Sequence, residues 1–292
     1  MLYDLSLHMS YAYDTSASGA HHVLRLLPLS IPERQRLIAG SITVDPTPEE
    51  TSNFLDFFQH PTTYLHLRAP HERLDIRMHA RVMVDSPAAT ADFSPTLDKM
   101  PVELADYWSL DPASPHHFIG ASPRLHDEPS ITAYARNGLE PDQTVRQIAE
   151  ALCTRIYTDF KYDGKATNVD TTPQEAFKLK RGVCQDFSHI MILALRSLGI
   201  PAGYVSGFLR TIPPPGKERL EGADAMHAWV RVWCGTTLSW IELDPTNNIP
   251  AGTDHIVVAY GRDYSDVAPV VGALKTYGGH KIEQAVDVIP LK

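Results

Sequence analysis

Three residues far apart in the sequence have the types that acyl transfer at a carbonyl group requires. Cys184 supplies a thiol, His227 follows it by 43 residues, and Asp244 follows His227 by 17. In such a set the thiolate attacks the carbonyl carbon. The imidazolium keeps the thiolate charged and later protonates the leaving amine, and the carboxylate fixes the imidazole tautomer and orientation. Because the three residues are distant in sequence, the elements that carry them decide whether they meet.

The cysteine is predicted to stand at the start of a buried helix. Apolar residues crowd the stretch from Phe187 to Leu198, too many for one stripe, so we expect neighbours on most sides of the helix. Gly199 suits the C′ position, and Pro201 follows two residues later. The unpaired N–H groups and the positive dipole end of a helix start favour thiolate. Taken alone, a cysteine at a helix start is most often a small packed hydrophobe.

The histidine and the aspartate fall on two predicted strands, over 225–234 and 238–244. Gly235-Thr236 between them suits a two-residue type II′ hairpin loop. In that register His227 and Asp244 lie directly opposite each other on one face, with Cβ atoms about 4.5–5.5 Å apart. A slip of one residue would put them on opposite faces. The hairpin therefore predicts a His–Asp pair.

His189 is the rival base, since it lies on the same predicted helix as Cys184. Five residues along a helix correspond to a rotation of about 500°, which leaves His189 about 140° away from the cysteine. We therefore expect His189 not to face the thiol.

Composition and charge limit the class of protein. The chain has 292 residues, of which 43% are hydrophobic and 21% charged, so a packed core is expected. The net charge of −9 argues against a nucleic-acid or anionic-membrane partner, and no apolar run reaches the length of a membrane span. Residues 1–13 do not have the pattern of a signal peptide. Three sparse cysteines form no disulfide framework, which favours a cytoplasmic location.

The fold class is predicted to be α+β, with an N-terminal antiparallel β-sandwich. Alternation over 1–13 and 73–84, with weaker strand candidates at 22–27, 36–44, 53–58 and 63–68, is typical of short sandwich strands. Helical patterns dominate from about residue 130, including an amphipathic stripe over 145–156 and a capped helix near 173–179. We therefore expect a β-domain over 1–95, a connecting segment over 96–130 and a catalytic domain over 131–292, with a pocket-building loop at 211–226.

The motifs around the three residues resemble those of bacterial transglutaminase-like proteins. The matching segments read RGVCQDF at 181–187, LGIPA at 198–202, GADAMHAWV at 222–230 and DPTN at 244–247. The resemblance implies a papain-like core with Cys184 as nucleophile on the central helix. It also implies that His227, as base, and Asp244, as orienting residue, lie on adjacent antiparallel strands. One departure is Met226, where a serine is more usual before the histidine; we expect Met226 to face away from His227.

An oxyanion hole and a substrate pocket are also required. The backbone N–H of Cys184 is one expected donor. Tyr162, in the turn before the capped helix, resembles an aromatic position that supplies the second donor in related enzymes, although a packed tyrosine is an equal alternative. Trp229 shares the His227 face and is expected either to wall the pocket or to pack in the core.

The sequence is compatible with several functions. Hydrolysis of an amide or peptide bond through a thioester is favoured, and transfer of the acyl group to an amine, as in a protein-glutamine transglutaminase, is the alternative. A peptide-binding scaffold without catalysis is a third reading. A zinc site of Cys184, His227 and Asp244 lacks a fourth ligand, so we expect neither a metal nor a cofactor. The expected partner is a peptide, protein or amide substrate; the oligomeric state is left open.

Overall fold

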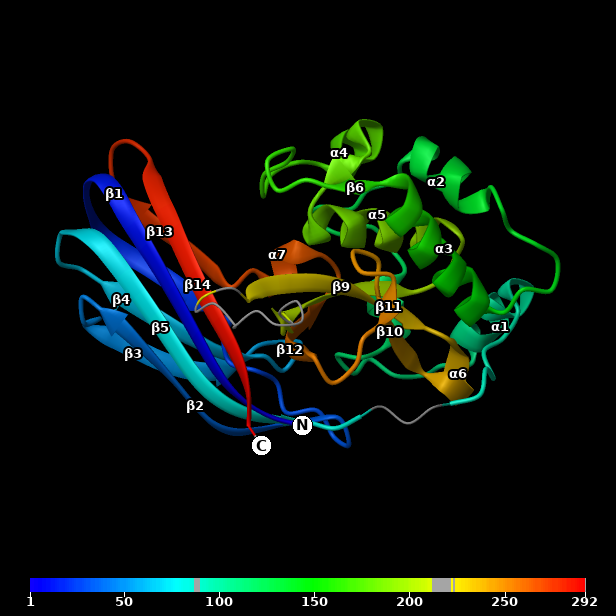
Figure 1. The fold of residues 1–292 in the computed structure, drawn as a ribbon, viewed down its shortest axis with the longest axis horizontal. Coiled ribbons are helices and arrows are strands. Elements are labelled where there is room, and N and C mark those ends of the chain that lie inside the picture. Colours follow the sequence, from blue (N-terminus) through cyan, green and yellow to red (C-terminus); the bar gives the residue numbers. More distant parts are fainter. Residues whose placement is uncertain (87–89, 212–221, 223, 292) are drawn as a thin grey trace, which may run out of the picture.

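The computed structural model describes residues 1–86, 90–211, 222 and 224–291. A strand-rich sheet packs beside a core in which helices cover a second sheet (Figure 1). The predicted α+β class is confirmed. Of the loop expected at 211–226, residues 212–221 and 223 lie outside the described residues.

Seven strands form the first sheet, and all of their pairings are antiparallel. They are β1 (Leu2–Leu24), β2 (Gln35–Asp45), β3 (Glu50–Leu55), β4 (Pro61–Leu67), β5 (His71–Val84), β13 (Val270–Lys275) and β14 (His280–Leu291). The strands predicted at 1–13 and 22–27 are thus parts of a single strand, β1. Its first half buries Tyr3, Leu5 and Leu7 on alternate positions, as the sequence pattern indicated.

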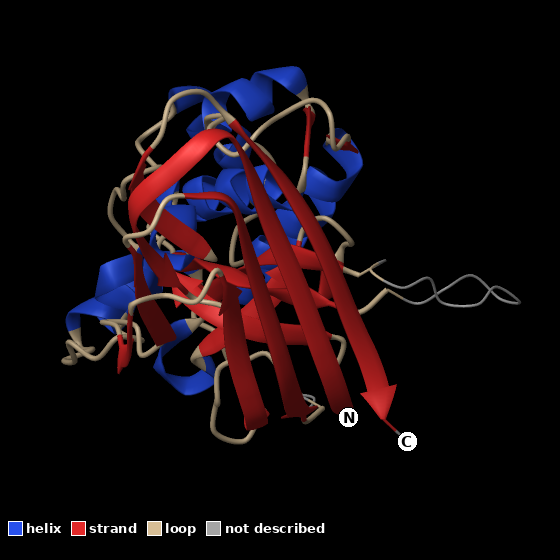
Figure 2. Ribbon diagram, turned by 90° about the vertical axis from the view of Figure 1, so that its left-hand side faces the viewer, coloured by secondary structure: helices blue, strands red, loops and turns tan. Residues whose placement is uncertain are grey.

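The registers show that the sheet consists of the long strand β1 and of neighbouring rows that are each divided into two shorter strands. β1 pairs with β5 over Leu2–Ala17 and with β4 over Ala20–Leu24, so β5 and β4 are successive halves of one neighbour. In the same way β2 and β3 pair with β5 and β4, and β14 and β13 pair with the other edge of β1. Figure 2 shows the long curved strands side by side. On both sides of β1 the change from one partner strand to the next falls between Tyr13 and Ala20.

The C-terminal boundary differs from the predicted one. Residues 270–291, which were expected in the catalytic domain, form β13 and β14 and pair with β1. Leu2 lies opposite Leu291, and Leu24 lies opposite Val270. Alternating patterns identify strands but not their partners, so sequence periodicity gave no sign that the last strands return to the first sheet.

The core contains a five-stranded sheet in the order β11-β10-β9-β8-β12. Its strands are β8 (Ala202–Leu209), β9 (Ala225–Trp233), β10 (Trp240–Asp244), β11 (Ile249–Pro250) and β12 (His255–Gly261). The short strands β6 (Lys161–Tyr162) and β7 (Arg181–Gly182) form a separate parallel pair. The helices are α1 (Met100–Ala105), α2 (Pro129–Arg136), α3 (Val145–Asp159), α4 (Pro173–Leu179), α5 (Cys184–Ser197), α6 (Gly235–Leu238) and α7 (Tyr264–Val267), with 3₁₀ turns at Leu97–Lys99 and Pro115–Phe118.

Helix α5 is the central element of the core. It contacts α2, α3 and α4 on one side and strands β8 and β9 on the other (Figure 1). Every residue from Asp186 to Arg196 is buried. The helix ends as predicted, because Gly199 adopts a φ of 80° and Ile200 donates its N–H to the carbonyl of Leu195 over 3.0 Å. Wrapping on most sides fixes the direction of α5, and with it the position of its first residue, Cys184.

Polar side chains from the first sheet hold the two parts together. The buried Gln35 amide donates to the carbonyl oxygens of Leu29 and Val257, and its oxygen accepts the N–H of Val257 over 2.8 Å. Arg34 forms a bidentate ion pair with Glu242 on β10. Because Glu242 also accepts from Trp229 and Tyr260, Arg34, in the turn just before β2, completes a polar cluster of the second sheet.

No helix within the described part of the chain is long and apolar enough to cross a bilayer.

Candidate active site

Cys184 is the first residue of α5, and the turn before it explains why the helix starts there. Val183 is the N-cap and has no side-chain oxygen, so Asp186 supplies the cap by accepting the Val183 N–H over 2.8 Å. Thr167 donates to the same carboxylate oxygen over 2.7 Å. A Cβ on Gly182 would lie 2.4 Å from that oxygen, so the residue at 182 must lack a side chain. The motif RGVCQD thus encodes the helix start.

Cys184 is the one cysteine of the three that is not buried. Burial raises the pKa of the Cys153 thiol to about 12, with a smaller contribution from Asp244, and burial likewise raises the pKa of Cys234. Both groups therefore stay protonated and shielded at neutral pH. The only thiol of the chain available to a ligand is the one at the helix start.

The hairpin that carries His227 and Asp244 differs in register from the prediction. Four residues, Gly235–Leu238, form the short helix α6 instead of a two-residue turn, and Ser239 adopts a φ of 58°. Trp233 therefore lies opposite Trp240, and Val230 opposite Leu243, two residues from the predicted pairing. A shift of two residues keeps side chains on the same face, because the strand period is two. His227 and Asp244 thus meet as diagonal neighbours.

His227 lies between the carboxylate and the thiol. Its Nε2 is 2.8 Å from Asp244 Oδ2, and its ring lines the same cavity as the Cys184 thiol, which contributes to its pKa. Burial alone would lower the pKa of His227, but the hydrogen bonds and the charges of Asp244 and Cys184 outweigh it and raise the pKa to about 10. The imidazole is therefore protonated at neutral pH. The structure brings together the three residues that the sequence proposed.

Asp244 is fully buried and accepts five hydrogen bonds. Besides His227 Nε2, its oxygens accept from the N–H groups of Thr246 and Asn247, from the Asn247 side chain over 2.7 Å, and from His255 Nε2 over 3.2 Å. Burial would raise the pKa of this carboxyl group, but the hydrogen bonds hold it well below its usual range. Asp244 is thus an ionised, immobilised partner for the imidazolium.

Sequence reasoning missed His255. The N–H of Gly252 donates to His255 Nδ1 over 3.2 Å, so Nε2 carries the proton and donates it to Asp244. Strands β10 and β12 are not neighbours in the sheet, so no pairing register could have predicted this contact. The only signal was a lone histidine just before the apolar run 256–259.

His189, the rival base, is held by contacts with Tyr204 and Tyr264. The ring is buried against Tyr204, and its Nε2 accepts the N–H of Tyr264 over 3.2 Å. Burial lowers the pKa of His189 to about 3, so the group is neutral. The Nε2 of His189 is therefore occupied by a structural hydrogen bond, whereas a catalytic base needs a free nitrogen.

Tyr162 and Trp229 occupy different surroundings. Tyr162 pairs with Gly182 in the β6–β7 ladder, and burial together with the nearby Cys184 raises its pKa. Trp229 is fully buried, donates to Glu242 over 2.5 Å and stacks behind the His227 ring. Among the described residues, Trp229 is not part of the wall of the cavity that holds Cys184. It therefore supports His227 from the core side.

A cavity of about 660 Å³ contains both Cys184 and His227. It lies between the two parts of the molecule, since the first sheet and the core both supply its walls. The first sheet contributes, among others, Met9, Tyr11, Tyr13, His22, Val271 and Ile282. The core contributes, among others, Arg124, Gln185, Tyr204, Met226 and Tyr264. Met226, which was expected to face away from His227, thus also lines this cavity.

Comparison with known proteins identifies the family to which the chain belongs. Residues 132–245 match the transglutaminase-like superfamily, and residues 3–83 match the bacterial transglutaminase-like N-terminal region. An uncharacterised protein of Mycobacterium tuberculosis is 36% identical over 272 residues, which cover 89% of this chain and 83% of the relative. The chain belongs to the bacterial transglutaminase-like proteins.

Two further relatives extend the likeness of this transglutaminase-like protein over nearly its whole length. An uncharacterised protein of Mycobacterium leprae is 28% identical over 284 residues, covering 96% of each chain. The crystal structure of a proposed cysteine protease from Cytophaga hutchinsonii aligns with a TM-score of 0.79 at 20% identity, covering 100% of this chain and 91% of that one. At that identity the structural likeness shows the fold.

A metal ion has one group of candidate ligands in the described part of this transglutaminase-like protein. The ligand atoms of His227, Asp244 and His255 lie within 4.8 Å of one another. Hydrogen bonds already occupy them, because Asp244 Oδ2 accepts from both Nε2 atoms. The set also lacks Cys184, which the sequence had offered as a zinc ligand beside His227 and Asp244. The donor set fits the orientation of an imidazole better than it fits a cation.

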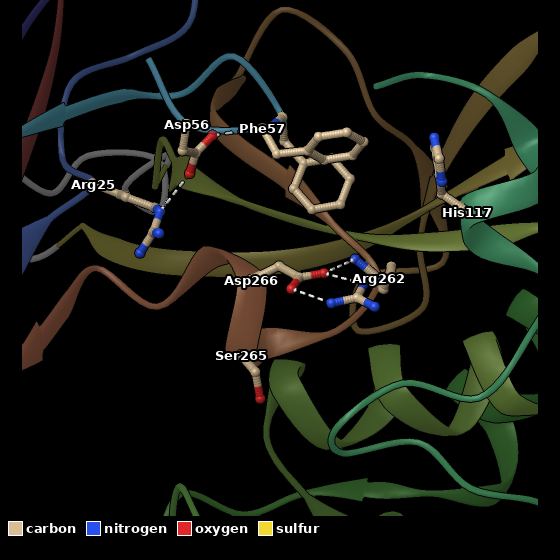
Figure 3. Close-up of a pocket in the computed structure, with 8 residues that line it drawn as sticks. Arg25, Asp56, Phe57, His117, Arg262, Ser265 and Asp266 are labelled. Atoms are coloured by element: carbon tan, nitrogen blue, oxygen red, sulfur yellow. Dashed lines mark hydrogen bonds and ion pairs between the residues drawn. The ribbon is translucent and has the colours of Figure 1, made fainter. Parts of the chain in front are cut away.

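A second cavity, of about 480 Å³, lies elsewhere between the two parts of the protein (Figure 3). Its arginines are paired with carboxylates: Arg25 with Asp56 at 2.8 Å, and Arg262 with Asp266 at 2.8 Å. Phe57 and His117 stack edge to face beside them. Neither Cys184 nor His227 lines this cavity, so it is separate from the candidate active site.

Proposed function

We propose that this protein is a cysteine-dependent acyl-transfer enzyme that cleaves an amide or peptide bond through a thioester. The observation that carries the proposal is the position of His227, which is hydrogen bonded to Asp244 at 2.8 Å and lines the same cavity as the Cys184 thiol. A protonated imidazole in that place stabilises a thiolate and holds a proton ready for a leaving group. An exposed thiol at a helix start with no such partner would not support the proposal.

In the first half-reaction the Cys184 thiolate attacks the carbonyl carbon of the substrate and forms a C–S bond. The oxyanion that develops accepts from the Cys184 backbone N–H, and Tyr162 is our candidate for the second donor. His227 then gives its proton to the amide nitrogen, the C–N bond breaks, and the amine leaves. The acyl group remains on sulfur as a thioester, with His227 neutral.

In the second half-reaction neutral His227 removes a proton from water, and the hydroxide attacks the thioester carbon. The C–S bond breaks, the thiolate is restored beside protonated His227, and a carboxylic acid leaves. If an amine takes the place of water, the product is a new amide and the enzyme is a transglutaminase. We favour hydrolysis, which agrees with the protease description of the solved Cytophaga hutchinsonii relative.

The compartment follows from the same chemistry. All three cysteines are unpaired, and the proposed nucleophile is one of them. A reducing environment such as the cytoplasm keeps that thiol available, so we propose a cytoplasmic location.

The decisive experiment compares wild type with Cys184→Ala on libraries of peptides and simple amides, with and without an added primary amine. We expect turnover by wild type only, release of a free acid without amine, and an intact fold in the variant, because alanine favours the helix. Cys153→Ala is the matched control and should keep turnover. Activity of Cys184→Ala above background would remove the thiol from the mechanism. Binding without turnover would favour a scaffold, and activity that tracks bound zinc in metal analysis would favour a metal site.

A further inference from the structure

One buried imidazole in the wall of the active-site cavity lies outside the group formed by Cys184, His227 and Asp244. His22, near the end of β1, is 4% exposed and lines the same cavity as the thiol. Neither of its ring nitrogens has a hydrogen-bond partner among the described residues. Buried polar groups are nearly always paired, so an unpaired buried imidazole in the cavity that holds the Cys184 thiol is a candidate to bind a ligand.

The sequence builds the orientation of this ring. His22 pairs with Gly272 on the neighbouring strand β13. A Cβ on Gly272 would lie 2.2 Å from His22 Nδ1 and 2.8 Å from its Cε1, so the ring occupies the space that a side chain at 272 would fill. The imidazole therefore leans over β13, whose residues Val271 and Gly272 also line the cavity. A glycine in a strand often marks such a close approach.

The charge state of His22 limits what it can bind. Burial, followed by the neighbouring His71 and His21, lowers its pKa to about 4. At neutral pH the ring is therefore uncharged and offers one N–H donor and one nitrogen acceptor. Such a group pairs with a hydroxyl or a carboxamide rather than with a carboxylate or a phosphate, which would favour a cationic partner.

Apart from the His227 imidazolium and Arg124, the rest of the cavity wall is also uncharged. Much of it is formed by apolar and aromatic side chains, among them Tyr11, Tyr13, Val270, Val271 and Leu274. None of its described lining residues is an aspartate or a glutamate, although the whole chain has a net charge of −9. Arg124 is its one arginine or lysine, and its guanidinium lies over the Tyr264 ring at 5.1 Å. The wall therefore fits an uncharged, partly apolar chain.

We propose that His22 is a specificity-determining residue of the acyl-transfer site. It hydrogen bonds the hydroxyl or carboxamide side chain of one residue in an extended, uncharged peptide whose scissile bond lies at Cys184. The inference rests on the proposed function and deepens it: the substrate is a peptide that reaches across the cavity from the core to the first sheet. In this proposal the first sheet, which carries His22, is part of the substrate-binding site.

The test uses uncharged fluorogenic heptapeptides in which each position flanking the scissile bond carries Thr or Val, or Asn or Leu. The members of each pair have similar shape and differ in hydrogen bonding. We expect wild type to prefer Thr or Asn at one position by about fivefold to tenfold in kcat/KM, since one net hydrogen bond has about that effect. His22→Phe should lose the preference at that position alone, and His22→Gln should keep part of it.

Two further variants separate recognition from folding. Gly272→Ala should weaken the same preference, because its Cβ displaces the ring. His21→Phe is the matched control: His21 is next in the strand, but its ring is bonded to Tyr64 at 2.6 Å and stacks on His66, so the preference should survive. Melting temperatures identify any variant that unfolds.

The outcomes distinguish this inference from the proposed function. If wild type turns peptides over but His22→Phe keeps the preference, or lowers kcat/KM equally for all peptides, the inference is overturned. If wild type turns nothing over, the proposed function fails. Calorimetric binding of the same peptides to Cys184→Ala, with and without His22→Phe, then decides whether His22 recognises them. Loss of a Thr or Asn preference in that binding would support the recognition role, and equal binding would end it.

Discussion

At the scale of single residues, the site depends on one carboxylate with an unusually full set of donors. Asp244 accepts five hydrogen bonds, and those from His227 and His255 converge on the same oxygen. His255 is held in the donor tautomer by Gly252. These hydrogen bonds hold the carboxylate in one orientation, and the carboxylate in turn fixes the orientation of the His227 imidazole.

Asp244→Asn is expected to lower kcat by between about 10² and 10⁴, because an amide can hold the imidazole in the wrong tautomer. Steady-state kinetics on the best substrate of the library measures the effect, and circular dichroism checks the fold. Asp4→Asn is the matched control, because Asp4 pairs with Arg81 on the exposed part of the first sheet. A rate within about threefold of wild type would mean that the aspartate does not orient the base.

The protonation of His227 gives a prediction for stability against pH. Its folded-state pKa of about 10 lies above the ordinary value of 6.5. The protonated form therefore stabilises the fold; this contribution is complete below about pH 6.5 and is lost as pH rises through about 10. The melting temperature of wild type should exceed that of His227→Gln at pH 6, and the difference should shrink by pH 10.

His126→Gln, at an exposed position, serves as control and should show a small and constant difference. The rate should follow the same group, with kcat/KM falling on the alkaline side as His227 loses its proton. A melting-temperature difference that grows with pH would show that neutral His227 is the form the fold prefers.

At the scale of elements, the start of α5 combines folding and function in one turn. The Asp186 carboxylate fills the space above Gly182 and caps the helix whose first residue is Cys184. Gly182→Ala should force that carboxylate to move and lower stability by about 1–3 kcal/mol. The rate should fall further than the stability alone explains, because the thiol moves with the turn.

Urea unfolding and kcat/KM measure the two effects of Gly182→Ala. Gly164→Ala is the matched control, since a Cβ at 164 meets nothing within 4 Å, and it should change neither quantity appreciably. An unaltered rate in Gly182→Ala, together with lower stability, would separate the cap from the position of the thiol.

The helices and strands also show which features could be predicted from the sequence and which could not. The helix over 184–197 and its glycine stop followed from local patterns, and the structure confirms both. The His227–Asp244 contact was predicted from a wrong register, because a short helix replaces the two-residue turn, but the error of two residues preserved the face. The contact of His255 with Asp244 joins strands that are not neighbours in the sheet, and the return of β14 to β1 joins segments distant in sequence. Local periodicity contains no information about such partners.

At the scale of the whole molecule, the two parts share charged contacts and the active-site cavity. Arg34, in the turn that leads into β2, neutralises Glu242 of the second sheet, whose side chain is 6% exposed. Arg34→Ala should lower stability by about 3 kcal/mol, because it leaves a buried carboxylate without its cation. Urea unfolding should shift equally by tryptophan fluorescence, which reports the core, and by far-ultraviolet circular dichroism, which reports both sheets.

Arg81→Ala is the control for this ion pair. Arg81 and Asp4 are both well exposed, so its loss should leave the unfolding midpoint nearly unchanged. If the two signals unfold at different urea concentrations in wild type, the sheet and the core are not one cooperative unit. The Arg34 contact would then stabilise only the part that unfolds with it.

The return of β13 and β14 to β1 sets an order of events during synthesis. Leu2 leaves the ribosome long before its partner Leu291 exists, so the first strand must wait with one edge uncovered. Cys184, His227 and Asp244 are all made before the two strands that wall their cavity. During synthesis the three site residues are therefore made first, and the strands that enclose their cavity are made afterwards. Completion of the cavity is coupled to the last pairing of the sheet, and contacts so distant in sequence form slowly.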